Sequence, residues 1–96
     1  MTLALLERFE KYDDEFLDFS KVKSPVSTRP DLCAFLILDT LCSSHQDIIA
    51  GAEHDEIYLG IDCEALQTKI TDEQIRDLVR CGVSFNEALD SLVLHI

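Results

Sequence analysis

Glycine and proline are scarce in this sequence, which has three glycines and two prolines among its 96 residues. So low a content argues against a flexible linker or a low-complexity chain. The longest strongly apolar run covers only residues 32–38, whereas a bilayer-spanning helix needs about 20 apolar residues. Residues 1–7 lack a basic start and a small-residue cleavage site. We therefore expect neither a transmembrane segment nor a secretory signal.

Basic residues are the second shortage. Eight lysines and arginines oppose 19 aspartates and glutamates, which gives a formal net charge of −11 at pH 7. Such a charge repels nucleic acid and anionic membranes, because both are polyanions. We therefore expect no direct binding to nucleic acid or to a membrane. The excess of acids favours a basic protein partner, or it serves only to keep the protein soluble.

Closely spaced cysteines are also absent. Four cysteines are present, at Cys33, Cys42, Cys63 and Cys81, and no two of them form a CxxC pair. Structural zinc sites usually draw their ligands from close pairs, so this spacing argues against zinc without excluding it. Free cysteine within an apolar pattern behaves as a small hydrophobic residue. We expect reduced thiols, no metal, no cofactor and a location in the cytoplasm.

The length fits one domain, and the N-terminal residues show a helical period within it. Apolar side chains recur in steps of three and four over residues 3–20, which predicts an amphipathic helix. These side chains are Leu5, Phe9, Tyr12, Phe16 and Phe19. The opposite face carries an acidic ridge made of Glu7, Glu10, Asp14 and Asp18.

A linker is predicted over residues 21–29, followed by a core over residues 30–96. Pro30 suits the first turn of a helix, and we expect this helix to run over residues 30–42. The helix is apolar on nearly every side, which predicts burial in the core or at a subunit interface. Phe35, Leu38 and Leu41 are the candidate interface residues for a homodimer.

The remaining residues predict short helices and strands. Residues 48–50 suggest a short helix ended by Gly51, and residues 56–61 alternate as a strand does. Asp62 is placed to cap a short helix over residues 63–68. Thr71 and Gln74 have the spacing of a capping box, which predicts a helix over residues 72–81 that ends at a left-handed Gly82.

Two further strands are predicted, over residues 83–85 and 91–96, joined by a loop over residues 86–90. With the strand over residues 56–61 they form a small, mainly antiparallel three-stranded sheet. About three main helices pack with it, so the fold class is α+β.

Four short segments of the sequence resemble those of a known family. They are RPDL (29–32), AEHDEIYL (52–59), LVRCGV (78–83) and DSLV (90–93). They are similar to segments of a family of small proteins of unknown activity, which are encoded by tailed bacteriophages and prophages. The resemblance covers residues 29–96 and implies a bacterial host cytoplasm, but it implies no reaction. The closing residues 94–96 depart from the terminal aromatic residue of that family.

Candidate chemistry is sparse. His54, Asp55 and Glu56 place an imidazole beside two carboxylates, which suits either a polar loop or part of an acid–base or metal site. A metal would need further ligands such as Asp62, Cys63 or His95. A nucleophilic role for Cys81 is disfavoured, because the end of a helix disfavours a thiolate.

The function that these patterns favour is that of a non-enzymatic interaction protein. A line of acids along a helix can imitate a phosphate backbone and occupy a nucleic-acid-binding groove on another protein. The same line also suits an ordinary solvated helix face. The alternative is a structural or assembly role as a small homodimer that binds no ligand.

Overall fold

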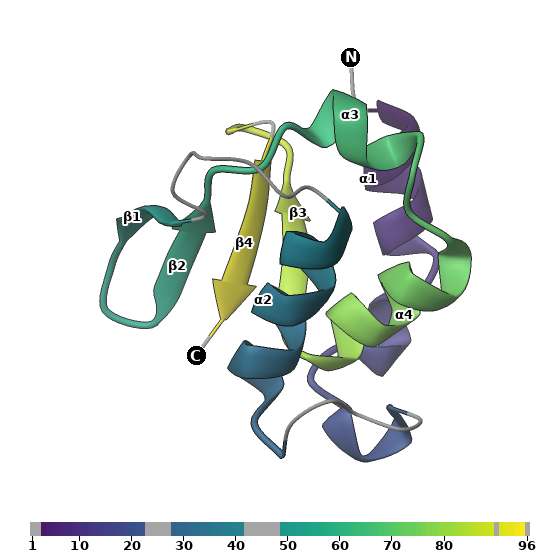
Figure 1. The fold of residues 1–96 in the computed structure, drawn as a ribbon, viewed down its shortest axis with the longest axis vertical. Helices are drawn as coiled ribbons and strands as arrows, with labels where there is room; N and C mark the ends of the chain where they lie inside the picture. Colours follow the sequence, from purple (N-terminus) through teal and green to yellow (C-terminus); the bar gives the residue numbers. More distant parts are fainter. Residues whose placement is uncertain (1–2, 23–27, 42–48, 90, 96) are drawn as a thin grey trace.

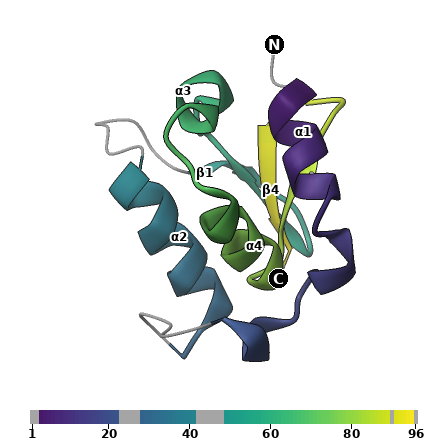
Figure 2. The same cartoon turned by 90° about the vertical axis from the view of Figure 1, so that its right-hand side faces the viewer.

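The computed structural model of the protein describes residues 3–22, 28–41, 49–89 and 91–95. Four strands form one antiparallel sheet in the order β1-β2-β4-β3. In Figure 1 the helices lie toward the β3 edge of the sheet, away from β1. Figure 2 shows the same arrangement from the side. The fold is therefore α+β as expected, with a four-stranded sheet in place of three strands.

Strands β2, β3 and β4 are the ones that the alternation predicts. They span Glu56–Leu59, Val83–Asn86 and Ser91–His95. Leu92 and Leu94 on β4 are fully buried in the core, together with Val83 and Leu59. The hairpin between β3 and β4 brings Asn86 opposite Ser91. Ile96 lies outside the described residues.

Strand β1, Ile49–Ala52, replaces the short helix predicted for residues 48–50. It pairs with β2 through Gly51 opposite Tyr58 and Ala52 opposite Ile57, with an irregularity between Ile49 and Gly51. The local sequence does not reveal this pairing, because strand formation here depends on the neighbouring strand. The expectation of a helix is wrong, although Ile48 itself lies outside the described residues.

Helix α4, Asp72–Arg80, is the central helix and lies between α1 and α2 (Figure 2). Its predicted capping box is present. Thr71 Oγ1 accepts from the Gln74 backbone N at 3.2 Å, and Gln74 Oε1 accepts from the Thr71 backbone N at 2.8 Å. Gly82 follows the helix with φ +98°, as the predicted left-handed end requires.

Helix α3, Cys63–Gln67, is short and begins as predicted. The Asp62 carboxylate accepts from the backbone N of Glu64 at 3.1 Å and of Ala65 at 3.3 Å. These bonds satisfy two N–H groups that have no partner inside the helix.

The N-terminal helix is shorter than the predicted 3–20. Helix α1 covers Leu3–Glu10, and two short 3-10 turns follow at Asp13–Glu15 and Phe19–Lys21. Leu17 has φ +63°, and its backbone N donates to Val79 O on α4 at 3.1 Å. A tertiary hydrogen bond has thus replaced the helical one. The predicted apolar side chains still point inward, with Leu5 and Phe9 buried and the later aromatics packed on the core.

Helix α2, Pro30–Leu41, matches the predicted helix over residues 30–42, of which Cys42 lies outside the described residues. Within the described chain its core side buries Cys33, Ala34 and Leu38, but the helix is not buried on every side. Leu32 is 46 % exposed and Leu36 is 48 % exposed, because α2 lies at the outside of the helical layer. Of the predicted linker over residues 21–29, Lys21 belongs to the second 3-10 turn and residues 23–27 lie outside the described residues.

Candidate protein-interaction surface

Arg8 fastens helix α1 to the start of α4. Its guanidinium donates to Gln67 O at 3.1 Å and to Ile70 O at 2.8 Å, and it pairs with the Asp72 carboxylate at 3.0 Å. Gln67 and Ile70 lie at the end of α3 and just beyond it, where carbonyls lack helical partners. The cation therefore stabilises the α3–α4 connection and fixes one side of α1 against it.

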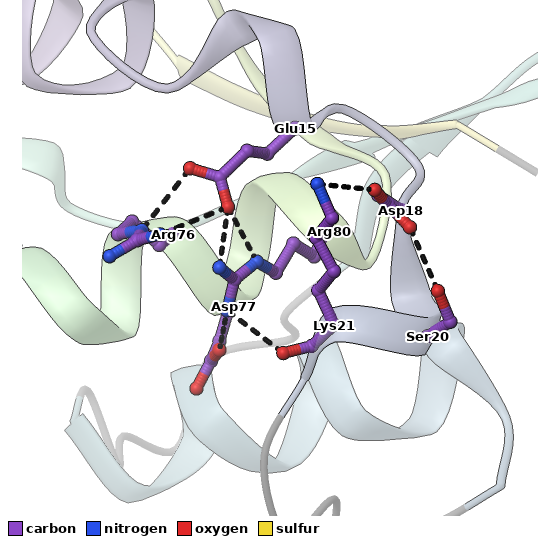
Figure 3. A network of polar contacts seen from close by, with 7 residues as sticks. All are labelled: Glu15, Asp18, Ser20, Lys21, Arg76, Asp77 and Arg80. Carbon is purple, nitrogen blue, oxygen red and sulfur yellow. Dashed lines mark hydrogen bonds and ion pairs between the residues drawn. The ribbon is translucent and has the colours of Figure 1, made fainter.

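Glu15 fastens the chain after α1 to the other end of α4 (Figure 3). Its carboxylate accepts from Arg76 Nε at 3.2 Å and from Arg80 Nε at 2.8 Å. Arg80 is buried and also donates to Lys21 O at 3.1 Å. The hydrogen bond from Arg76, aided by Arg80, lowers the pKa of Glu15 below its ordinary value of 4.5. The network holds Glu15 inward as an anion.

These contacts leave four carboxylates pointing outward from α1 and the turn after it. Glu7, Glu10, Asp13 and Asp14 are exposed, and among the described residues none of them forms an ion pair. We call these four residues the acidic surface. It contains three residues of the predicted acidic ridge, and adds Asp13.

Asp18, the fourth residue of the predicted ridge, is neutralised. It pairs with Lys21 Nζ at 3.1 Å and accepts from Ser20 Oγ at 2.9 Å. The hydrogen bond from Lys21 lowers the pKa of Asp18 below its ordinary value. Because the helix ends at Glu10, the ridge is not a single regular helical row. The successive acids at 13–15 were a sequence signal for this break, since aspartate is a poor helix former.

Intramolecular ion pairs occupy much of the positive charge. Arg29 pairs with Asp31 at 3.1 Å, and Arg8, Lys21, Arg76 and Arg80 have the carboxylate partners given above. Lys11 lies on α1's side of the molecule with Nζ 5.5 Å from the centroid of the Tyr12 ring. Most of the described cations are therefore paired with carboxylates of the same chain, and the excess negative charge lies on the surface.

A small hollow adjoins the acidic surface. It has a volume of about 140 Å³ and lies between α1, the end of α4 and strand β3. Glu10 and Asp13 line one side of it, and Phe9, Val83 and Ser84 lie among its other lining residues. Two carboxylates that form no ion pair with any other described residue stand beside this hollow, which suits the entry of a cationic side chain.

His54, Asp55 and Glu56, which suit either a polar loop or part of an acid–base or metal site, lie in the bend between β1 and β2 and at the start of β2. His54 and Asp55 are exposed, whereas Glu56 is half-buried on β2 opposite His95. His95 Nε2 instead lies 2.9 Å from Ser84 Oγ, and the His95 ring meets the Phe16 ring edge-on at 5.2 Å. Over the described ranges, no three His, Cys, Asp or Glu side chains are grouped as metal ligands.

Three of the four cysteines, Cys33, Cys63 and Cys81, lie among the described residues, and all three are buried. Burial raises the pKa of Cys81 to about 12, so its thiol stays protonated at neutral pH. A protonated, buried thiol is a poor nucleophile. Cys42 lies outside the described residues.

The predicted interface residues on α2 point inward. Leu38 is fully buried, and Phe35 and Leu41 pack against the core. The apolar side chains that α2 exposes are Leu32 and Leu36, which are four residues apart and so share one face. In the part of the chain that the structure describes, no helix has the length and apolar character needed to cross a bilayer.

Comparison of the chain with protein-family models, with curated proteins and with solved structures finds no match. The resemblance to bacteriophage proteins therefore remains a prediction from the sequence. What this protein does has to be inferred from its surface.

Proposed function

We propose that this chain is a non-enzymatic interaction protein that binds a basic protein partner through the acidic surface. The observation that supports it is the hollow flanked by Glu10 and Asp13, two carboxylates without an ion pair among the described residues. A lysine or arginine side chain of the partner enters this hollow and pairs with both carboxylates. Glu7 and Asp14 extend the negative potential on either side and speed the encounter.

The resemblance to bacteriophage proteins is part of this proposal. It suggests a chain that acts in the cytoplasm of a bacterial host, as an adaptor or as an inhibitor that imitates nucleic acid. The shortened helix α1 favours a local anchoring contact over imitation of a long phosphate backbone, because the acids no longer follow one helical row. A nucleic-acid-binding protein and an ordinary basic protein are both suitable partners.

A titration followed by NMR tests the proposal with a short arginine peptide as the probe. We expect the largest shifts at the amides of Glu10, Asp13 and Ser84. The double variant Glu10→Gln/Asp13→Asn should bind the peptide at least about tenfold more weakly, equal to about 1.4 kcal/mol.

The matched control is Asp39→Asn/Glu87→Gln, which removes the same charge from two exposed positions elsewhere. It should change the affinity by no more than about twofold, because exposed charges far from the contact are screened by salt. Equal weakening by both double variants would show that only the net charge attracts the peptide, and the acidic surface would then not be a site.

A homodimer is the second candidate, and the exposed pair Leu32 and Leu36 on α2 favours it. Exposed leucines on one helix face suit a two-fold contact with a second copy. We expect light scattering to give a dimer mass in high salt, and Leu32→Lys/Leu36→Lys to return the monomer mass. The control Leu89→Lys, at an exposed leucine elsewhere, should leave the mass unchanged. A wild-type monomer in high salt excludes the dimer.

A further inference from the structure

A second hollow lies over strands β1 and β2, on the face of the sheet opposite the core residues Leu59 and Leu94. Its volume is about 450 Å³, and its lining residues are Ala50, Gly51, Glu53, Tyr58, Leu89 and Ser91. Tyr58 alternates with the core residues Ile57 and Leu59, so its ring points to the opposite face. We call this hollow the sheet groove.

The floor of the sheet groove is apolar and open because of a glycine. A Cβ added at Gly51 would lie 3.6 Å from Tyr58 Cδ2, so the missing side chain leaves the flank of the ring uncovered. Leu89, which is 54 % exposed, lies beside the groove at the turn between β3 and β4. An apolar side chain of a partner would bury the flank of Tyr58 and the side of Leu89 together.

The surroundings of the groove are acidic. Glu53 lines the groove. Burial raises the pKa of Tyr58, and the nearby charges of Glu53, Glu56 and Asp55 raise it further. The sequence has no lysine or arginine between residues 30 and 68 or after residue 80, so none of the four described strands carries a lysine or an arginine. An occupant that offers positive charge beside its apolar group is therefore complementary.

We propose that the sheet groove binds a segment of a partner protein in which an apolar side chain stands next to lysine or arginine. The apolar side chain packs on Tyr58 in the space that Gly51 leaves open, and the cation pairs with Glu53 and Asp55 at the rim. Strand β1 has a neighbouring strand on one side only in the described sheet, so its outer backbone groups are placed to pair with an extended segment.

This site is separate from the acidic surface. In Figure 1 strand β1 and helix α1 lie at opposite sides of the molecule. A chain with a binding surface at each side can connect two partners, so the sheet groove favours an adaptor over a simple inhibitor. The inference does not depend on the proposed role of Glu10 and Asp13.

Gly51→Val fills the groove and is the test variant. Its backbone is not in the left-handed region and its Cβ has ordinary space, and valine suits a strand. The variant should therefore unfold at the wild-type temperature or above it. Ala52→Val is the matched control, because it places the same side chain on the same strand but on the other face.

The probe is a short peptide of alternating lysine and leucine, titrated into labelled protein and followed by NMR. We expect shifts at Ala50, Gly51, Tyr58 and Ser91. Gly51→Val should weaken binding at least about tenfold and Ala52→Val less than about twofold. Peptides in which glutamate replaces lysine, or serine replaces leucine, should bind more weakly than the original, since each lacks one of the two required groups.

Charge variants separate this site from the acidic surface. Followed at the groove amides, the affinity for the lysine–leucine peptide should fall in Glu53→Gln/Asp55→Asn and should be unchanged in Glu10→Gln/Asp13→Asn. The inference is overturned if Gly51→Val binds as the wild type does, or if the shifts fall on residues 7–14 instead. It is also overturned if the groove amides shift with protein concentration in the absence of peptide, because a second copy of the chain would then be the occupant.

Discussion

Replacing Gly82 with alanine should destabilise the protein strongly. Gly82 has φ +98°, a conformation that L-residues with a Cβ adopt at a cost of about 1–2 kcal/mol. The new Cβ would also lie 2.7 Å from Leu17 Cδ2 and 3.0 Å from His95 O. The Leu17 side chain is able to move, but His95 O is backbone, and the β3–β4 pairing fixes it through His95 N donating to Gly82 O at 2.8 Å.

The backbone strain and the overpacking at residue 82 together amount to a large share of the free energy of unfolding. Overpacking of this kind costs about 1–3 kcal/mol, so Gly82→Ala should lose about 2–5 kcal/mol in all. A chain of this length has a free energy of unfolding of about 5–14 kcal/mol. We therefore expect the melting temperature to fall by roughly 10–30 °C.

Urea unfolding followed by circular dichroism measures the effect. Gly51→Ala is the control, because its Cβ meets only Tyr58 at 3.6 Å and its backbone is not left-handed. It should change the stability by less than about 1 kcal/mol. Adding Leu17→Ala to Gly82→Ala should recover part of the loss, since one of the two contacts is removed. A Gly82→Ala protein within about 0.5 kcal/mol of the wild type would refute the reasoning.

Three other predictions concern buried or paired groups. Arg80→Met should lower the free energy of unfolding, measured in urea, by roughly 2–4 kcal/mol, because Arg80 is buried. Arg76→Met should lower it by less than about 1 kcal/mol, because the Arg76 side chain is 43 % exposed. Equal losses in the two variants would contradict the role of burial. Folding lowers the pKa of Glu15, so its carboxylate stabilises the fold above pH 4.5, and this contribution is lost as the pH falls below that value. The melting temperature of Glu15→Gln should therefore depend less on pH in the acid range than that of the wild type. The Cys81 thiol, whose pKa burial raises to about 12, should react with iodoacetamide at pH 8 only after unfolding, and mass spectrometry showing rapid labelling of the native protein would contradict this.

The elements that the sequence predicts well are those that local interactions decide. The capping box of Thr71 and Gln74 and the left-handed Gly82 define the ends of α4 within one stretch of chain. Asp62 likewise caps α3 through the two N–H groups that follow it. Short-range hydrogen bonds and backbone sterics need no knowledge of the rest of the molecule.

The elements that the sequence predicts poorly depend on partners far along the chain. The helical period over residues 3–20 is real, but the chain leaves the helix after Glu10, and Glu15 instead reaches Arg76, which is 61 residues away. Strand β1 forms because β2 pairs with it. Without knowledge of that pairing, the local sequence predicts Gly51 as the end of a helix. The exposure of Leu36 likewise depends on the place of α2 in the helical layer.

The candidate sites likewise depend partly on features visible in the sequence and partly on the tertiary structure. The sequence by itself determined the excess of acids, the helical period of the N-terminal apolar side chains and the lack of lysine and arginine between residues 30 and 68 and after residue 80. Only the tertiary structure decided which acids form ion pairs among the described residues, since Glu15 pairs with the distant Arg76 and Arg80 while Asp13 stays exposed. It also decided that Gly51 lies beside Tyr58 and opens the sheet groove. The physical reason is that charge and period are properties of the chain, whereas pairing and exposure are properties of which segments meet.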